Sequence, residues 1–236
     1  MTRPGIRCEA IAEDALLLRF GERIDVAVSA AVLAAAARVQ QALPQLECVP
    51  AYASLLLRFD PLIWLSDGDA SPHERVQAAV RAALEATDAA VAAPRMVEIP
   101  VCYGGAFGPD LDALAAHAGL DTEATIALHA GGDYRVAMLG FAPGFPYLLG
   151  LDQRLAMPRR ADPRQRVPAG SVAIGGSQTG IYPAELPGGW QLIGRTPLRL
   201  FDANAASPAL LQAGDRVRFR AIDTDTFHRL AETEPA

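Results

Sequence analysis

The first 93 residues alternate between short apolar runs and apolar residues at helical spacing. Residues 6–12 and 15–20 are apolar runs on either side of an acidic pair, a pattern typical of a β-hairpin. After Asp25, apolar residues recur at spacings of three and four until Pro44, which predicts an amphipathic helix that the proline ends. This part of the chain therefore begins with two strands and a helix.

The same order then repeats. Residues 46–52 and 54–59 predict two further strands, and a second helix is expected to begin after Ser71. Ser71 and Glu74 have the spacing of a capping box, and Pro72 suits the first helical position. The order ββαββα predicts a small sheet covered by two helices on one face, an α+β domain.

The pattern changes in the rest of the chain. Residues 96–103 alternate as a strand does, and short helices are expected from Asp110 to Gly119 and over 122–129. Many short strands and turns follow, ending at 214–220, where Val217 and Phe219 should point inward and the intervening arginines outward. Such a series predicts a closed or nearly closed, mainly-β barrel.

Glycine and proline mark where the two patterns meet. Residues 1–93 contain three glycines and five prolines, whereas residues 94–236 contain 17 glycines and 13 prolines. Because these residues form turns, the second part should be richer in loops. We expect two domains, 1–93 and 94–236, with the boundary near Ala92-Ala93-Pro94.

Charge and composition exclude several functions. All 21 basic residues are arginine, which excludes a Schiff-base lysine and a Walker A lysine. The net charge of −6 argues against non-specific nucleic-acid binding. Three scattered cysteines and four scattered histidines predict reduced thiols and no metal site. Without a signal peptide or a sufficiently long apolar segment, we expect a cytoplasmic protein that does not enter the membrane.

The unusual segment is 139–196, where glycine and proline are dense. Within 140–200 there are seven arginines against three acidic residues. Because a guanidinium binds carboxylate or phosphate bidentately, Arg160, Arg164 and Arg195 could line an anion site. The alternatives are that the glycines and prolines only turn the corners of a barrel, and that the arginines face solvent or a partner.

Familiar catalytic motifs are absent or incomplete. Residues 175–180 resemble the start of a P-loop, but Ile181 stands where a lysine is required. His117 and His129 lie on the expected short helices, where a histidine more often packs or caps than acts as a base, and His129 is kept as the catalytic candidate. Asp110, in a Gly-Pro-Asp sequence, is best explained as a helix N-cap, and a functional role for its carboxylate stays open.

Several long motifs occur in an order that resembles a known family. They are GFAPGFPYL at 140–148, VPAGSVAIGG at 167–176, QTGIYP at 178–183 and PGGWQLIGRTP at 187–197, with YGG at 103–105, GPDL at 108–111 and LH at 128–129. Together they closely resemble the KipI / allophanate hydrolase subunit 1 family, which includes the B subunits of bacterial 5-oxoprolinase. The resemblance implies an N-terminal α+β domain followed by a cyclophilin-like β-barrel.

The resemblance also implies a function in a complex. In 5-oxoprolinase, a B-type chain works with a C-type (KipA-like) subunit and an A-type subunit, and ATP with magnesium is used by the complex to convert 5-oxo-L-proline to L-glutamate. Two alternatives come from the same family. One is a KipI-like inhibitor of a sensor histidine kinase, and the other is a carboxyltransferase half-site of a urea carboxylase-like system.

We predict a site from the motif positions and the local charge. Its apolar wall is expected to contain Phe141, Pro143, Gly144 and Phe145. Its polar contacts to the substrate are expected to come from Arg160, Gln178, Tyr182 and Arg195. Residues of a partner are expected to complete it, since the sequence reveals no compact acid/base pair.

Overall fold

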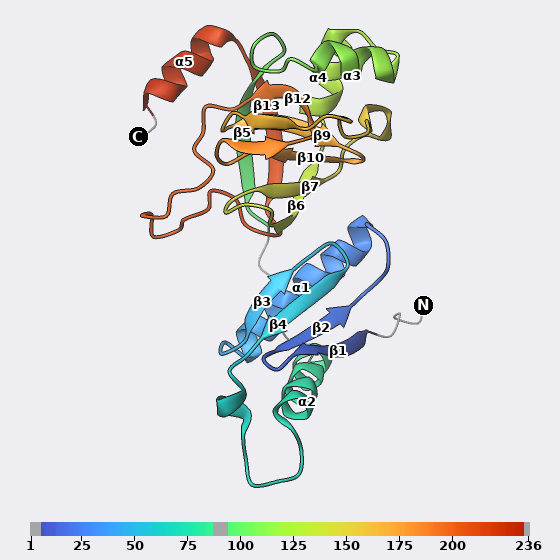
Figure 1. Ribbon diagram of the computed structural model, residues 1–236, viewed down its shortest axis with the longest axis vertical. Helices are drawn as coiled ribbons and strands as arrows, with labels where there is room; N and C mark the ends of the chain where they lie inside the picture. The colour runs from blue at the N-terminus through green and yellow to red at the C-terminus, as the bar shows by residue number, and fades with distance from the viewer. Residues whose placement is uncertain (1–5, 87–93, 234–236) are drawn as a thin grey trace. The chain divides into compact units, whose positions relative to one another are not determined.

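The computed structural model describes residues 6–86 and 94–233 (Figure 1). The chain forms two compact units, Met1–Ala93 and Pro94–Ala236. The boundary expected near Ala92-Ala93-Pro94 falls largely on residues 87–93, which lie outside the described residues. No helix in the described ranges is both long enough and apolar enough to cross a bilayer.

The first unit has the predicted order of elements. These are β1 (Arg7–Ala12), β2 (Ala15–Arg19), α1 (Val26–Ala42), β3 (Glu47–Pro50), β4 (Ser54–Arg58), the 3-10 helix η1 (Pro61–Trp64) and α2 (Pro72–Glu85). The strands form an antiparallel sheet in the order β1-β2-β4-β3. Asp25 caps α1 by accepting from the backbone N–H groups of Ala27 and Val28, and Ser71 and Glu74 form the expected capping box. Each of the four strands is one to three residues shorter than predicted.

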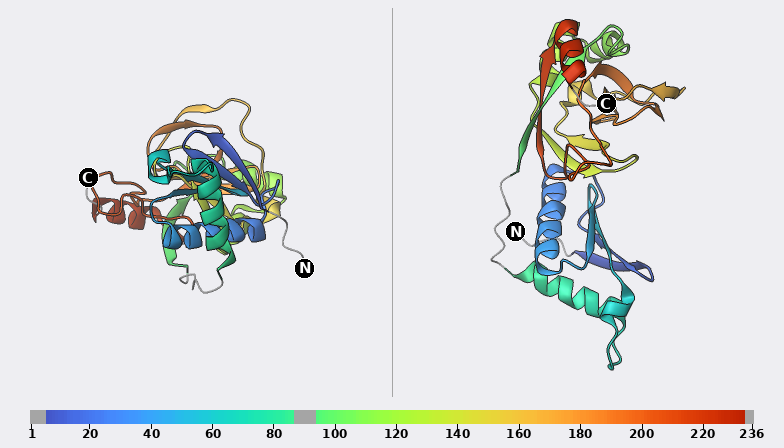
Figure 2. Two further views of the ribbon diagram at one scale, coloured as in Figure 1. Left: turned by 90° about the horizontal axis from the view of Figure 1, so that it is seen from below. Right: turned by 90° about the vertical axis from the view of Figure 1, so that its left-hand side faces the viewer.

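One face of this sheet carries the core. Leu16 and Leu18 on β2 and Leu55 and Leu57 on β4 are buried against residues of α1 and α2, such as Val32 and Val76. In the right-hand view of Figure 2, α1 and the strands form separate layers. The prediction of two helices on one face of a small sheet is confirmed.

The second unit is a barrel with short helices around it. Its elements are β5 (Met96–Tyr103), α3 (Leu111–Ala118), α4 (Thr122–Ala130), β6 (Tyr134–Leu139), β7 (Pro146–Leu149), the 3-10 helix η2 (Gln153–Leu155), β8 (Arg164–Val167), β9 (Ser171–Gly175), β10 (Gln178–Ile181), β11 (Leu186–Gly188), β12 (Gln191–Arg195), β13 (Arg216–Ile222) and α5 (Thr224–Thr233). Seven strands close the barrel in the order β10-β7-β6-β13-β5-β12-β9, while β8 and β11 form a separate two-stranded sheet. The predicted closed barrel is confirmed.

The first and last strands of the barrel lie side by side. Strand β5 pairs in parallel with β13, from Met96 opposite Arg216 to Cys102 opposite Ile222. The other neighbouring strands of the barrel pair antiparallel. On β13, Val217 and Phe219 are buried while the arginines between and beside them are more exposed, as the alternation predicted.

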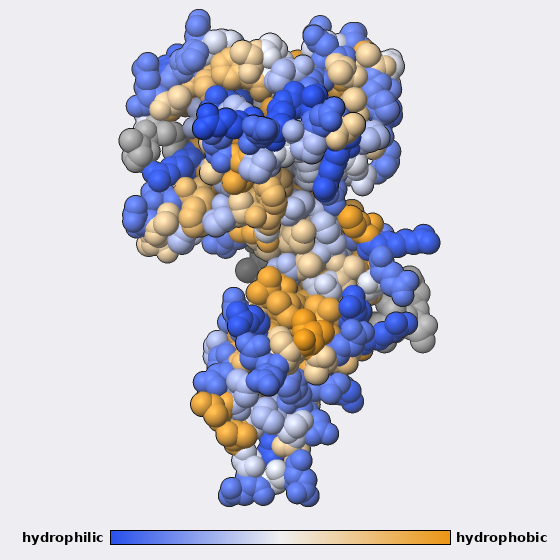
Figure 3. Space-filling view, in the orientation of Figure 1, coloured by the Kyte–Doolittle hydropathy of each residue, from blue (hydrophilic) through white to orange (hydrophobic). Residues whose placement is uncertain are grey.

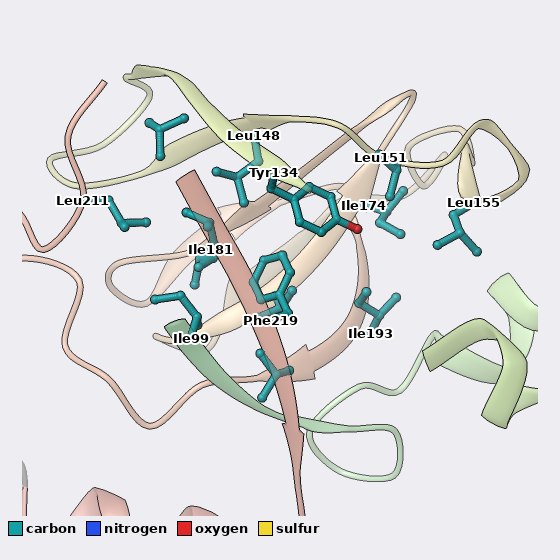
Figure 4. Packing of buried hydrophobic residues seen from close by; sticks show 14 of the residues in the cluster. Ile99, Tyr134, Leu148, Leu151, Leu155, Ile174, Ile181, Ile193, Leu211 and Phe219 are labelled. Carbon is teal, nitrogen blue, oxygen red and sulfur yellow. The ribbon is translucent and has the colours of Figure 1, made fainter. Parts of the chain in front are cut away.

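The interior of the barrel is mainly aliphatic. Side chains from opposite strands, including Ile99, Leu148, Ile174, Ile181 and Ile193, meet around Tyr134 and Phe219 (Figure 4). Leu111 and Leu114 of α3 join the same cluster, so this helix covers part of the barrel. The barrel is therefore a packed core, and a ligand site must lie outside it.

Candidate functional site

The outer face of β9 and β10 lacks large apolar side chains of its own. On both strands the inward residues are bulky, whereas Ala173, Gly175 and Gly180 face outward. A Cβ atom added at Gly175 would lie 2.6 Å from the Trp190 ring, and one at Gly180 would lie 3.0 Å from the Phe145 ring. Glycine at these positions lets aromatic rings lie directly against the sheet.

Five aromatic residues cover this surface, and we call them the outer aromatic cluster: Phe141, Phe145, Tyr147, Tyr182 and Trp190. Phe145 is buried at the centre of the cluster. The centroid of its ring is 4.9 Å from that of Tyr147, 5.2 Å from Tyr182, 5.4 Å from Phe141 and 5.6 Å from Trp190. Most of these contacts are edge-to-face, a favoured geometry for aromatic pairs. The cluster forms a second apolar core on the outside of the barrel.

The loop between β6 and β7 holds Phe141 in an unusual conformation. Phe141 has φ of 70°, and the Ala142 N–H donates to the Gly140 carbonyl at 2.8 Å, so Phe141 is the central residue of a γ-turn with positive φ. Such a turn is rare and strained for a residue with a Cβ atom. Phe141 is nevertheless 63% exposed. An exposed aromatic ring in a strained turn is typical of a residue kept for function.

The same loop frames an open hollow. Residues 139–144 line a space of about 360 Å³ beside Phe141, and Pro143 and Gly144 form part of its wall. Gly144 has φ of 80°, and a Cβ atom there would lie 2.8 Å from Cβ of Phe201. Because only glycine fits this position, the shape of the loop depends on it.

Tyr182 adds a phenol to the aromatic surface. Burial raises the pKa of Tyr182, and the neighbouring Trp190 backbone offsets part of this rise. A Cβ atom at Gly188 would lie 2.1 Å from the Tyr182 hydroxyl, so glycine at 188 makes room for it. The phenol stays protonated at neutral pH and is able to donate a hydrogen bond.

Residues 158–164 contain three arginines, and we call this stretch the arginine segment. It lies beside the outer aromatic cluster. The Arg159 guanidinium is 5.7 Å from the centroid of the Trp190 ring, within the range of a cation–π contact. Arg164 Nη2 is 2.8 Å and Arg160 Nη1 is 3.4 Å from Oδ1 of Asp110. The anion that Arg160 and Arg164 share in this structure is therefore a carboxylate of the protein.

Asp110 corrects a prediction. It precedes α3 at the N-cap position, but its side chain makes no capping hydrogen bond. Its Oδ2 instead accepts from the Leu192 N–H at 2.7 Å, and its Oδ1 accepts from the two arginines. The prediction of a side-chain N-cap was wrong because the local sequence cannot show partners that are 50 or more residues away.

The structure brings together most, but not all, of the predicted site residues. Phe141, Pro143, Gly144, Phe145 and Tyr182 lie around the outer aromatic cluster, and Arg160 lies beside it. Gln178 lies on the outer face of β10, and its side chain makes no hydrogen bond to the residues that the structure describes. Arg195 Nε donates to the Ala169 carbonyl at 2.7 Å, away from Asp110. The roles of these residues in binding stay predictions.

His129, the candidate base, lies on the other side of β10. It is completely buried, with Nδ1 2.8 Å from the Tyr103 hydroxyl and Nε2 3.1 Å from Oγ1 of Thr179. Thr179 donates to the Ala173 carbonyl, so its hydroxyl accepts from Nε2–H of a neutral imidazole. Burial lowers the pKa of His129 to about 3. We interpret His129 as part of the barrel core, remote from any ligand on the outer face.

Trp190, Tyr147 and Arg159 lie in the candidate site and were absent from the predicted set. A signal for them exists in the sequence, because Gly175 and Gly180 fall on the same face of two adjacent strands. Such a smooth patch indicates that large side chains from elsewhere must cover it. Which side chains cover it depends on loops whose paths the sequence pattern does not predict.

Comparison with known proteins identifies the class to which this fold and face belong. Residues 6–211 match the family described as the carboxyltransferase domain, subdomain C and D. A crystal structure of TTHA0988 superposes with a TM-score of 0.76 and 40% sequence identity, covering 89% of this chain and 40% of that chain. This protein thus spans about 40% of the length of that related chain. By class, the chain described here is therefore a carboxyltransferase-type domain.

The more similar relatives define the family within this class. The B subunit of 5-oxoprolinase from Bacillus subtilis (strain 168) is 46% identical over 230 residues, which cover 95% of this chain and 96% of the relative. The B subunit of 5-oxoprolinase from Escherichia coli O157:H7 is 59% identical over 125 residues, 53% of this chain and 57% of that relative. The chain belongs to the family of 5-oxoprolinase B subunits, and the resemblance inferred from its motifs is confirmed.

Proposed function

We propose that this chain is the B subunit of an ATP-dependent 5-oxoprolinase and acts with C-type and A-type subunits to convert 5-oxo-L-proline to L-glutamate. The observation that carries this proposal is the 46% identity to the B subunit of a 5-oxoprolinase along nearly the whole of both chains. The outer face of the barrel supports it, because it combines an apolar surface with arginines.

The chemistry of the substrate fits these groups. 5-Oxoproline has a flat five-membered lactam ring and a carboxylate. In the proposal, the ring lies against the outer aromatic cluster and the carboxylate faces the arginine segment. Phosphorylation of the lactam oxygen by ATP with magnesium would make the carbonyl carbon more electrophilic and give it a better leaving group. The groups on this face are suited to binding and orientation, and the partner subunits complete the reaction.

An exposed apolar segment supports a role in a complex. Leu62, Ile63 and Leu65, in and just after η1, are all more than half exposed. The orange area at the lower left of Figure 3 lies over this segment. Adjacent exposed aliphatic side chains are typical of protein contact sites, so the proposed complex has at least one apolar surface available for it.

The test is reconstitution of the enzyme from purified subunits. The chain is mixed with C-type and A-type subunits, ATP, magnesium and 5-oxo-L-proline, and glutamate is measured over time. Omitting this chain or ATP is expected to abolish product. Two other outcomes would overturn the proposal: binding to a histidine kinase with loss of its autophosphorylation, or biotin-dependent carboxyl transfer, each without glutamate formation.

A further inference from the structure

Asp110 is buried and holds two arginines, although its position at the start of α3 would suit a simple cap. We propose that Asp110 is a positioning residue, which orients the guanidinium groups of Arg164 and Arg160 toward an anionic group of the ligand. The ligand group is a carboxylate or a phosphate. This inference rests on the proposed function, since both 5-oxoproline and ATP carry such groups.

The carboxylate itself is rigidly placed. Asp110 N–H donates to the Leu192 carbonyl at 2.9 Å, and the Leu192 N–H donates to Oδ2 of Asp110 at 2.7 Å. The preceding loop lies against the same strand, because a Cβ atom at Gly108 would lie 2.1 Å from the Ile193 carbonyl oxygen. Strand β12 of the barrel thus fixes the oxygen, Oδ1, that the arginines contact.

The charges around Asp110 do not balance. The arginine segment carries three positive charges, from Arg159, Arg160 and Arg164. Two acids lie beside them: Asp110, which contacts Arg160 and Arg164, and Asp162, which lies within the segment. The group therefore has a net charge of +1. Arg164 also retains an unused donor, since its Nη1 is buried without a hydrogen-bond partner among the described residues. A second anion would supply both the missing charge and the missing acceptor.

The arginines also lie next to the aromatic surface. Arg164 on β8 pairs with Gly188 on β11, and Gly188 is the residue whose missing side chain leaves room for the Tyr182 hydroxyl. Arg159 lies over Trp190. A ligand that contacts Tyr182 or Trp190 can therefore place a charged group near Arg164.

The backbone of the arginine segment does not depend on Asp110. Met157 and Gly176 exchange two backbone hydrogen bonds of 3.1 and 2.8 Å, and the Arg160 N–H donates to the Gly189 carbonyl at 2.7 Å. Gln191 Nε2 donates to the Pro158 carbonyl at 2.8 Å. Removing the charge of Asp110 should therefore free the guanidinium groups while the segment keeps its path.

The test compares Asp110→Asn with Asp215→Asn in the reconstituted enzyme. Asp215 is a matched control, since both aspartates are 6% exposed, and Asp215 accepts from Arg95 at 2.6 Å and from the Gln212 N–H at 2.8 Å, away from the outer face. We expect Asp110→Asn to raise KM for one anionic substrate about tenfold, the effect of losing one well-oriented charged hydrogen bond, with kcat changed less than about threefold. Asp215→Asn should leave KM within about twofold.

Separate KM values identify the anion. A rise for 5-oxoproline alone assigns the carboxylate, and a rise for ATP alone assigns a phosphate. The variant Arg164→Gln and the double variant Asp110→Asn/Arg164→Gln complete the test, because a residue that acts through Arg164 adds little once Arg164 is gone. Unchanged KM values in Asp110→Asn, with the same fall in Tm as in Asp215→Asn, would show a purely structural role and overturn the inference.

A direct titration separates this inference from the proposed function. Tryptophan fluorescence of the chain mixed with its C-type subunit is followed while 5-oxoproline or ATP is added, because Trp190 lies beside Arg159. If the wild-type complex makes no glutamate, the proposed function fails, and this titration decides the inference. Binding at least about tenfold tighter to the wild type than to Asp110→Asn supports it. Equal or absent binding rejects it.

Discussion

The two faces of strands β9 and β10 differ although they share one backbone. Val172, Ile174 and Ile181 face inward to the aliphatic core, whereas Ala173, Gly175 and Gly180 face outward beneath aromatic rings. The inner face fills its space with its own side chains, whereas the outer face is covered mainly by aromatic residues from other segments, most of them loops. The difference suggests that inner residues determine whether the barrel folds and outer residues determine what it binds.

The largest expected effect is a loss of stability caused by a substitution on the inner face. Phe219 is buried, with its ring centroid 4.6 Å from that of His129 and 5.1 Å from that of Tyr134. Phe219→Ala should lower the free energy of unfolding by about 3–5 kcal/mol, because it removes a large side chain and leaves a cavity. Urea denaturation followed by circular dichroism measures this. A loss below about 1 kcal/mol would contradict the assignment of this ring to the core.

Acid should weaken the inner face next. Burial lowers the pKa of His129 to about 3, so the folded protein keeps this ring neutral while the unfolded chain takes up a proton below about pH 6.5. Its contribution is therefore complete above pH 6.5 and falls as the pH drops toward 3, by about 1.4 kcal/mol per pH unit. The expected loss at pH 5 is about 2 kcal/mol.

Urea denaturation at pH 7, 6 and 5 measures this slope, and His129→Gln is the control. The control should be less stable at pH 7 and should lose less stability between pH 7 and 5. This window lies above the range in which ordinary carboxylates titrate. Parallel slopes for the two proteins would show that His129 is not the group responsible.

A substitution on the outer face is expected to have the smallest effect on stability. Its effect on activity should nevertheless be large. Phe141→Gly removes an exposed ring and relieves the positive φ, while glycine adds freedom to the unfolded chain. These terms oppose each other, so the free energy of unfolding should change by less than about 1 kcal/mol. Glutamate formation by the reconstituted enzyme should fall at least tenfold, about 1.4 kcal/mol of lost binding. Full activity would remove Phe141 from the site.

The sequence predicted features that depend on near neighbours. The helix that follows Asp25, the capping box at Ser71 and the alternation of Val217 and Phe219 are local, and the structure contains them. The series of short strands and turns also predicted the barrel, and the resemblance of the motifs to a known family drew attention to the loop around Phe141. Features that depend on distant partners were not predictable from local pattern.

Asp110 and His129 illustrate that limit. Asp110 was expected to cap a helix, but its partners Arg160, Arg164 and Leu192 come from later strands and loops. His129 was a candidate base because of its residue type, and only its position inside the closed barrel reveals its neutral, buried state. Burial and long-range pairing are properties of the whole fold.

The pairing of β5 with β13 has a consequence for how the protein is made. The barrel cannot close until residues 216–222 are available to residues 96–102, and contacts so distant in sequence are slow to form. During synthesis the N-terminal sheet can form first. Strands β5 and β6 each keep one unpaired edge until β13, which pairs with both, has been made. A premature stop before Arg216 would leave both edges open to other chains, so aggregation would be its main result.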